Sequence, residues 1–159
     1  MKTKRKWLLG LVILTLLVAV SFLVRVGFRG QRSATPSDLN EEYAKFQGTW
    51  ELLSMEADGA PKPESEYKKY TMMFTNNVWT VLEGTNVKAE TPFDLDPTSN
   101  PKTIDLYPSD GRVLQGIYTL DGDRFTMCDR GTEKGDRPTT FATEPESGLV
   151  LVTLRRLKR

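Results

Sequence analysis

Beyond residue 46 the chain is divided into short segments in which apolar and polar side chains alternate. The period is two in 103–107, in 114–120 and in 125–128. This alternation is typical of β-strands that bury one face against a core. The segments predicted to be strands are 49–57, 69–75, 78–83, 87–95, 103–107, 113–120, 124–129, 139–142 and 149–157.

Short turns separate these segments and favour an antiparallel arrangement. Asn76-Asn77 and Asp121-Gly122 are two-residue connections whose residue types tolerate positive φ, as tight hairpins require. Strands at such regular spacing predict an all-β fold, a small antiparallel barrel of about eight strands. Nine segments are one more than such a barrel needs. An eight-stranded barrel holds packed side chains or one small ligand.

One helix is expected ahead of the first strand. Asp38-Leu-Asn-Glu41 has the form of a capping box, in which Asp38 accepts backbone N–H groups and Glu41 reaches back to it. We therefore predict that the barrel domain, residues 38–159, opens with a short helix that ends near Lys45.

The first 37 residues have a different pattern. Residues 1–6 are basic, 7–24 form an apolar run of 18 residues, and 25–37 are mostly small and polar. At about 1.5 Å per residue the run just spans a bilayer core. We interpret 7–24 as an uncleaved transmembrane signal anchor, 1–6 as its cytoplasmic flank and 25–37 as a tether. A cleavable signal peptide, and hence secretion, is the alternative.

Charge supports this division of the chain. The net charge is +1, but residues 1–33 carry seven positive side chains and no acid, which leaves the other 126 residues at −6. A weak excess of basic residues ahead of the run places the barrel outside the cytoplasm. An acidic barrel repels phosphates, so no nucleic-acid partner is expected. The chain has no histidine and one cysteine, which speaks against catalysis, metal sites and cofactors.

A motif at the start of the first strand resembles the lipocalins. Phe46-Gln-Gly-Thr-Trp50 has the Gly-x-Trp arrangement that opens the first strand of that fold, behind a short helix. The resemblance implies that Gly48 and Trp50 close the barrel base, with a basic side chain of the last strand over the indole. Arg155 and Arg156 are the two candidates for that cation–π contact.

A wider set of motifs is similar to one family in particular. In order along the chain they are 47–52, 56–59, 101–106, 116–118, 121–123 and 136–138. Together they resemble the planctomycetal lipocalin-like domain of unknown function, over roughly residues 46–158. The resemblance implies a small β-barrel, often behind a signal sequence or membrane anchor, and it implies no reaction.

Two functions of different classes follow. In the first, the barrel binds a small apolar ligand against inward-facing side chains, here Leu114, Tyr118, Leu120, Phe125 and Met127. In the second, the barrel is filled and the protein is an envelope interaction module. A charged loop would then contact the partner through Glu133, Asp136 and Arg137. The alternative is a solvated connection in which Asp136 and Arg137 form an ion pair that holds the turn.

We therefore expect a membrane-anchored, extracytoplasmic, non-catalytic protein without a cofactor. Its partners would be the membrane and either a small apolar molecule or an envelope protein. The single thiol, Cys128, is expected to be buried and inert, although its strand phase points it away from Phe125 and Met127.

Overall fold

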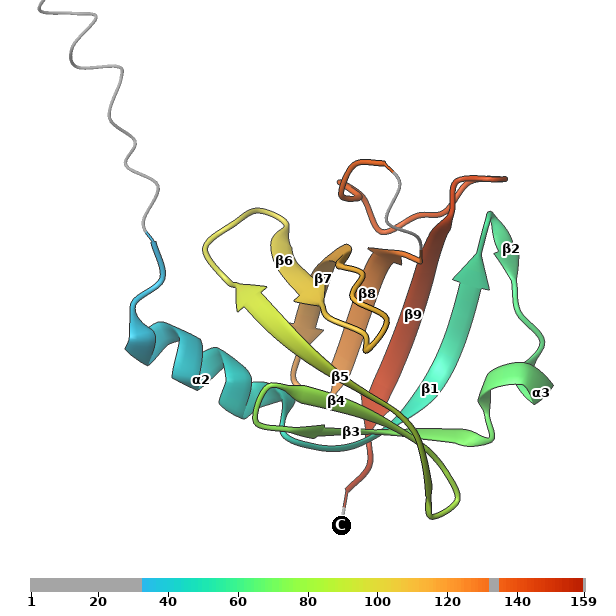
Figure 1. The fold of residues 1–159 in the computed structure, drawn as a ribbon, viewed down its shortest axis with the longest axis horizontal. Helices are drawn as coiled ribbons and strands as arrows, with labels where there is room; N and C mark the ends of the chain where they lie inside the picture. Colours follow the sequence, from blue (N-terminus) through green and yellow to red (C-terminus); the bar gives the residue numbers. More distant parts are fainter. Residues whose placement is uncertain (1–32, 132–134, 159) are drawn as a thin grey trace, which may run out of the picture. The chain divides into compact units, whose positions relative to one another are not determined.

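The computed structural model describes residues 33–131 and 135–158, and these form an antiparallel β-barrel (Figure 1). Eight strands close the barrel in up-and-down order, and a ninth, two-residue strand, β2, pairs with β1 alone. The prediction of an all-β barrel with about eight strands is confirmed. The strands are β1 (Gly48–Ala57), β2 (Ala60–Pro61), β3 (Tyr70–Thr75), β4 (Val78–Glu83), β5 (Asn86–Asp96), β6 (Lys102–Leu106), β7 (Leu114–Asp121), β8 (Arg124–Arg130) and β9 (Leu149–Arg156).

Pairing between β1 and β9 closes the barrel. Trp50 lies opposite Arg156, and Leu52 opposite Leu154, with a register shift between Leu52 and Ser54. The other edge of β1 pairs with β3, where Trp50 lies opposite Met72. Each remaining strand pairs with its neighbours in the sequence, as hairpin connections require.

The predicted strand at 139–142 is absent. In the structure this segment has no ladder partner and lies outside β8, where the Ala142 carbonyl accepts a long contact from Cys128 Sγ at 3.7 Å. The next residue, Thr143, donates to Glu56 and accepts from the Gly59 N–H at 2.9 Å. Side-chain bonds of this kind hold a loop in place, and they replace the backbone ladder that the alternation suggested.

Within the described ranges two helices accompany the barrel, α2 (Pro36–Phe46) and α3 (Glu64–Tyr67). The predicted capping box is displaced by three residues. Thr35 is the cap: its hydroxyl accepts from the Asp38 N–H at 3.2 Å, and Asp38 Oδ2 accepts from the Thr35 N–H at 3.0 Å. Pro36, which suits the first helical position, makes the earlier start possible. The helix α3 had no counterpart in the prediction.

The predicted membrane segment, 7–24, lies outside the described residues, as do its flank, 1–6, and residues 25–32 of the predicted tether. Residues 36–37 of that tether belong to α2. Among the helices of the described residues, none has the length and apolarity needed to cross a bilayer.

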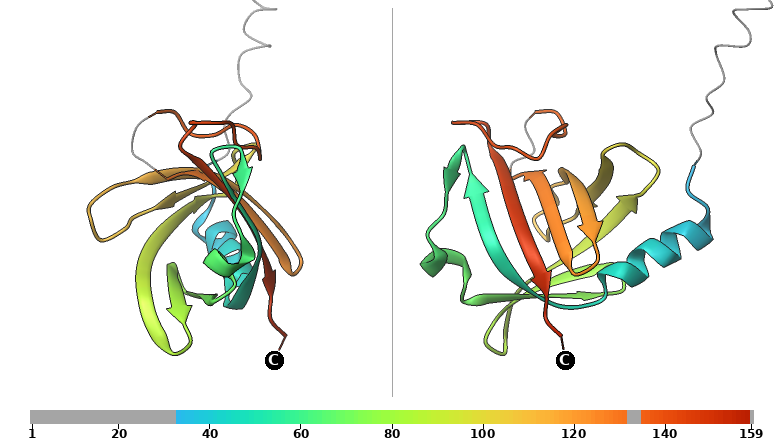
Figure 2. Two further views of the ribbon diagram at one scale, coloured as in Figure 1. Left: turned by 90° about the vertical axis from the view of Figure 1, so that its right-hand side faces the viewer. Right: turned by 180° about the vertical axis from the view of Figure 1, so that it is seen from behind.

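The barrel has two distinct ends. At one end α2 runs into β1, next to the point where β9 finishes (Figure 1). Segment 135–148 lies at the other end, where β1 finishes and β9 begins (Figure 2). We call the first the closed end and the second the open end, because their interiors differ as described below.

Candidate functional site

Aromatic rings fill the closed end. Phe46, the last residue of α2, inserts between strands and lies 5.1 Å from Phe125 and 5.4 Å from Tyr118, ring centre to ring centre. Phe74 and Phe93 complete the cluster at 5.7 and 5.8 Å from Phe46. All five side chains are at most 1% exposed. Their tilted and edge-to-face packing turns this half of the barrel into a solid core.

Trp50 lies beneath this cluster, and an arginine covers it. Its indole N–H donates to the Phe46 carbonyl at 2.9 Å, and Arg156 Cζ lies 4.1 Å from the centre of its ring. Of the two arginines that the lipocalin resemblance offered, Arg156 therefore makes the cation–π contact. Arg155 points outward and pairs with Glu51 at 2.5 Å.

Arg156 also joins three segments of backbone. It donates to the carbonyls of Lys45 and Gln47 at the end of α2, and its Nε pairs with Asp123 at 3.1 Å in the β7–β8 turn. Gly48 lies directly beside it with φ of +119°, and a Cβ there would be 3.4 Å from Arg156 Nη1. Glycine at 48 is thus required by the backbone conformation.

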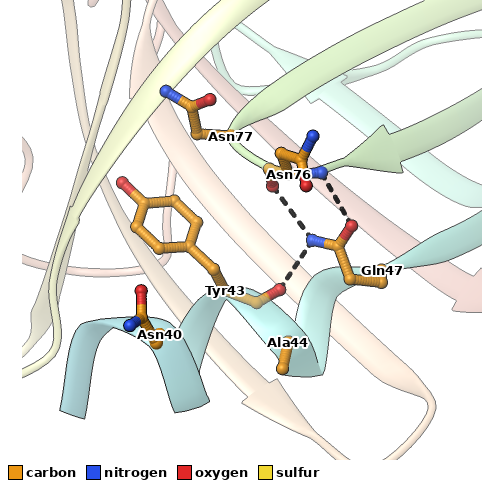
Figure 3. Close-up of a pocket in the computed structure, with 6 residues that line it drawn as sticks. All are labelled: Asn40, Tyr43, Ala44, Gln47, Asn76 and Asn77. Atoms are coloured by element: carbon orange, nitrogen blue, oxygen red, sulfur yellow. Dashed lines mark hydrogen bonds between the residues drawn. The ribbon is translucent and has the colours of Figure 1, made fainter. Parts of the chain in front are cut away.

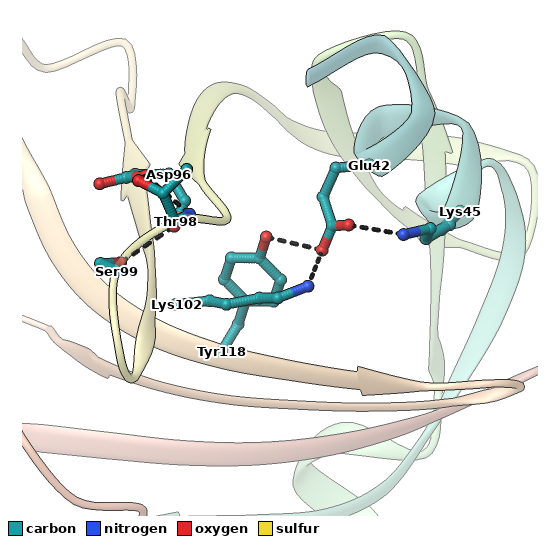
Figure 4. Close-up of polar contacts among 7 residues, drawn as sticks. All are labelled: Glu42, Lys45, Asp96, Thr98, Ser99, Lys102 and Tyr118. Carbon is teal, nitrogen blue, oxygen red and sulfur yellow. Dashed lines mark hydrogen bonds and ion pairs between the residues drawn. The ribbon is translucent and has the colours of Figure 1, made fainter. Parts of the chain in front are cut away.

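A buried carboxylate secures α2 to the barrel (Figure 4). Glu42 is 3% exposed and accepts from Lys102 at 2.6 Å, from the Tyr118 hydroxyl at 2.9 Å and from Lys45 at 2.9 Å. Burial alone would raise the pKa of Glu42, but these donors outweigh it and hold that pKa below its ordinary value. The pKa of Tyr118 is raised, by burial first and by the Glu42 charge second. The group is fully paired, and its role is structural.

A cavity of about 340 Å³ occupies the open end. Its apolar lining comes from seven of the eight barrel strands and includes Leu52, Met55, Leu106, Leu114, Met127 and Val152. Tyr67 of α3 and Tyr70 of β3 also line it, and the exposed Glu66 stands beside them. A cavity of this size and character is typical of a site for a small ligand.

The five residues predicted to contact a ligand are divided between the two ends. Leu114 and Met127 line the cavity. Tyr118 and Phe125 belong to the aromatic cluster of the closed end, and Leu120 is partly buried against the core without lining the cavity. The structure thus places three of the five away from the space where a ligand fits.

Two polar groups of the cavity wall have no hydrogen-bond partner among the described residues. The Trp79 indole N–H is buried and unpaired. Asp129 is 7% exposed, lines the cavity and makes no side-chain hydrogen bond or ion pair with any residue of 33–131 or 135–158. Burial raises the pKa of Asp129 to about 7. The inward position of Asp129 could have been predicted from the alternation along β8, since Phe125, Met127 and Asp129 occupy every second residue of that strand.

A glycine lies next to Asp129 where the two strands approach closely. Gly116 of β7 lies opposite Asp129 in the ladder. A Cβ at 116 would come within 3.0 Å of Asp129 Cβ, 3.2 Å of Ile104 Cγ2 and 2.9 Å of the Cys128 carbonyl oxygen. Any side chain at this position would collide with its neighbours, so glycine at 116 permits the close approach of β7 and β8 beside Asp129.

A second hollow lies on the outer surface, between α2 and the β3–β4 turn (Figure 3). It measures about 450 Å³ and is lined by Asn40, Tyr43, Ala44, Gln47, Asn76 and Asn77. The Gln47 amide there is already used: it donates to the Tyr43 and Asn76 carbonyls at 2.8 and 2.9 Å and accepts from the Asn76 N–H at 2.7 Å. These bonds fasten the turn to the helix, and they leave the barrel cavity as the better candidate.

The charged loop is bound to the barrel wall. Arg137 donates to the carbonyls of Ile104 and Gly116 at 3.2 and 2.7 Å and pairs with Asp105 at 2.7 Å. Its ionic partner is therefore Asp105 and not Asp136, whose carbonyl accepts from Arg130. Glu133, the third residue predicted for a partner surface, lies outside the described residues.

The single thiol is enclosed. Cys128 is fully buried on the outer side of β8, under Ala142, and burial raises its pKa to about 11. A thiol with so high a pKa is protonated at neutral pH and a poor nucleophile. In residues 33–131 and 135–158, no group of three or more Asp, Glu, His or Cys side chains is arranged to hold a metal ion.

Comparison with known proteins gives no relative from which a function could be transferred. No protein-family model, curated protein or solved structure matches the chain. The function is therefore inferred from the geometry of the cavity.

Proposed function

We propose that this protein is a non-catalytic binding module that takes one small, mostly apolar molecule into the open end of its barrel. The observation that carries the proposal is the cavity of about 340 Å³ inside the barrel. Burying apolar ligand surface against this lining contributes about 25 cal/mol per Å². At the packing density of protein interiors, the space suits a molecule of roughly 12 to 17 non-hydrogen atoms.

The cavity also favours ligand binding over the alternative of a filled barrel that serves only as an interaction module. Filling is complete at the closed end, where Phe46 enters from α2, but it stops short of Leu114 and Met127. Membership of the planctomycetal lipocalin-like family is part of the same proposal. It is supported by the closed barrel and by the contact between Trp50 and Arg156.

Titration of the full-length protein with naphthylethanol, a neutral probe of suitable size, tests this function. Trp79 lines the cavity, so its indole ¹⁵N–¹H signal reports occupancy at the site itself. We expect saturable shifts of that signal in the wild type and their loss in Leu114→Trp, which fills the cavity. Val113→Trp is the matched control, because Val113 is the preceding residue and is 41% exposed. Failure of naphthylethanol and of related probes with the same ring to move the Trp79 signal in the wild type would refute the proposed function.

We further propose that residues 7–24 hold the protein at the cell membrane with the barrel on the extracytoplasmic side. The support is the uncharged run of 18 residues behind a basic flank. The full-length chain is expected to stay with membranes after alkaline washing and to be cut by protease added outside the cell. Recovery of the full-length chain in the soluble fraction would contradict an anchor. A mass that lacks the leader would instead indicate a cleaved signal peptide.

A further inference from the structure

We propose that the cavity selects small apolar amines, with the Asp129 carboxylate as the counter-ion of the bound ammonium group. This inference rests on the proposed function, because it names the chemical class of the ligand for the same cavity. It starts from a buried polar group that has no partner among the residues the structure describes.

The position of Asp129 is the first step. The side chain is 93% buried, lines the cavity and has no partner in the described part of the chain. A buried carboxyl group without a hydrogen bond lowers stability, so such groups are normally paired. An ammonium group on a ligand supplies both the missing donor and the missing positive charge.

The charges around Asp129 point to a cation. The other titratable side chains of the lining are Glu66, Tyr67 and Tyr70, and none of them carries a positive charge. The nearest basic residue along β8, Arg130, is engaged elsewhere, since it donates to the carbonyls of Asp136 and Ser147, each at 3.0 Å.

The next basic residue at this end is also occupied. Arg112, in the β6–β7 connection, pairs with Asp110 at 2.8 Å and donates to the Gly131 carbonyl at 3.1 Å. An anionic ligand such as a fatty acid would therefore meet two carboxyl groups, Asp129 and Glu66, and no cation among the described lining residues. Like charges this close disfavour binding, whereas an amine is attracted.

The rest of the lining defines the body of the ligand. Leu52, Met55 and Met127 are apolar, so the amine must carry a hydrocarbon or aromatic group to fill the space. The unpaired Trp79 N–H can in addition donate to an acceptor on the ligand or to the face of an aromatic ring. These features describe an arylalkylamine more closely than a polar amine such as an amino acid.

Three probes with the same ring and chain test the inference: naphthylethylamine, naphthylethanol and naphthylacetate. Each is titrated into the full-length protein at pH 8, and the Trp79 indole signal is followed. Because burial raises the pKa of Asp129 to about 7, the carboxyl group is mostly ionised at this pH. We expect the amine to bind about tenfold to a hundredfold more tightly than the alcohol, and the carboxylate to bind most weakly.

Two variants assign the preference to one residue. Asp129→Asn keeps the shape and removes the charge, so the advantage of the amine over the alcohol should fall to about threefold or less. Glu64→Gln is the matched control: Glu64 is an acidic residue of α3 that is not among the lining residues, its side chain is 67% exposed, and its loss should change the preference little.

The possible failures are distinct. If the alcohol binds and the amine binds no better, or if Asp129→Asn keeps the preference, the amine proposal is overturned and the binding function stands. If none of the three probes moves the Trp79 signal, the binding function itself fails.

Discussion

The two ends of this barrel treat a buried carboxyl group in opposite ways. Glu42 at the closed end is 3% exposed and has three donors, and its pKa lies below the ordinary value. Asp129 at the open end is 7% exposed and has no partner among the described residues, and burial raises its pKa to about 7. Two carboxyl groups with similar burial therefore have pKa values shifted in opposite directions.

The difference shows what each end is built for. Around Glu42 every donor comes from the protein, so the charge serves to dock α2. Asp129 faces the cavity and has no donor among the described residues, so the protein bears the cost of an unsatisfied group. A loss of stability that no nearby contact offsets is typical of a functional site.

Truncation of the aromatic cluster should have the largest effect on stability. We expect Phe46→Ala to lower the free energy of unfolding by about 3 to 5 kcal/mol, since it opens a hole in a closely packed core. Leu114→Ala, at the cavity, should cost only about 1 to 2 kcal/mol, because Leu114 is half-buried and adjoins existing space. Denaturant unfolding of both variants checks the contrast, and equal costs would contradict the distinction between the two ends.

The pH dependence of stability should come next in size. The pKa of Asp129 is raised in the folded state, so the unfolded chain releases this proton near pH 4 and the folded protein near pH 7. Between these values the folded state holds more protons, and stability falls as pH rises. Asp129→Asn should remove this fall and be about 2 to 4 kcal/mol more stable than the wild type at pH 8. Free energies of unfolding are measured for both proteins from pH 4 to 8. If they change in parallel with pH, Asp129 is not the cause of the fall in stability.

Glu42→Gln should lower the stability of the fold, whereas Asp129→Asn should raise it. We expect it to lower the free energy of unfolding by about 1 to 3 kcal/mol at pH 7, since it weakens three bonds to the carboxylate. The pKa of Glu42 is lowered in the fold, so its contribution is present above the unfolded value of 4.5 and is lost as pH falls through the folded value. The gap between wild type and variant should therefore narrow in acid, and a constant gap would contradict this account.

The smallest contrast separates the two neighbouring arginines. Arg156→Lys should cost about 1 to 2 kcal/mol, because lysine cannot cover the Trp50 ring and reach both carbonyls of the α2 end. Arg155→Lys should change stability by less than about 0.5 kcal/mol, since Arg155 is 61% exposed and pairs on the surface. Thermal unfolding of the two variants, side by side, measures the difference.

Strand alternation was enough to predict the barrel but not the depth at which each side chain lies. Period two identifies which face of β7 and β8 points inward, and the inward set includes Leu114, Tyr118 and Met127. The alternation does not indicate that Phe46 enters the barrel from α2 and fills one half of its interior. That depends on a contact between α2 and strands far along the chain, which no local pattern records.

The polar part of the site was missed for a related reason. Asp129 continues the inward phase of Phe125 and Met127, but a search for apolar lining passes over a carboxyl group.

The predicted strand at 139–142 was wrong because side-chain bonds, among them those of Thr143, hold that segment against the barrel. Such bonds depend on the assembled barrel and leave little trace in the order of residues.

The pairing of β1 with β9 has a consequence for how the protein folds. The partners Glu51 and Arg155 are separated by 104 residues, so the ring of strands cannot close until nearly all of the barrel has been made. Contacts this distant in sequence slow folding, and until they form β1 and β9 each present an unpaired edge to other chains. A nascent chain is therefore most prone to aggregate just before closure, and protection of those two edges is what a chaperone for this protein would have to provide.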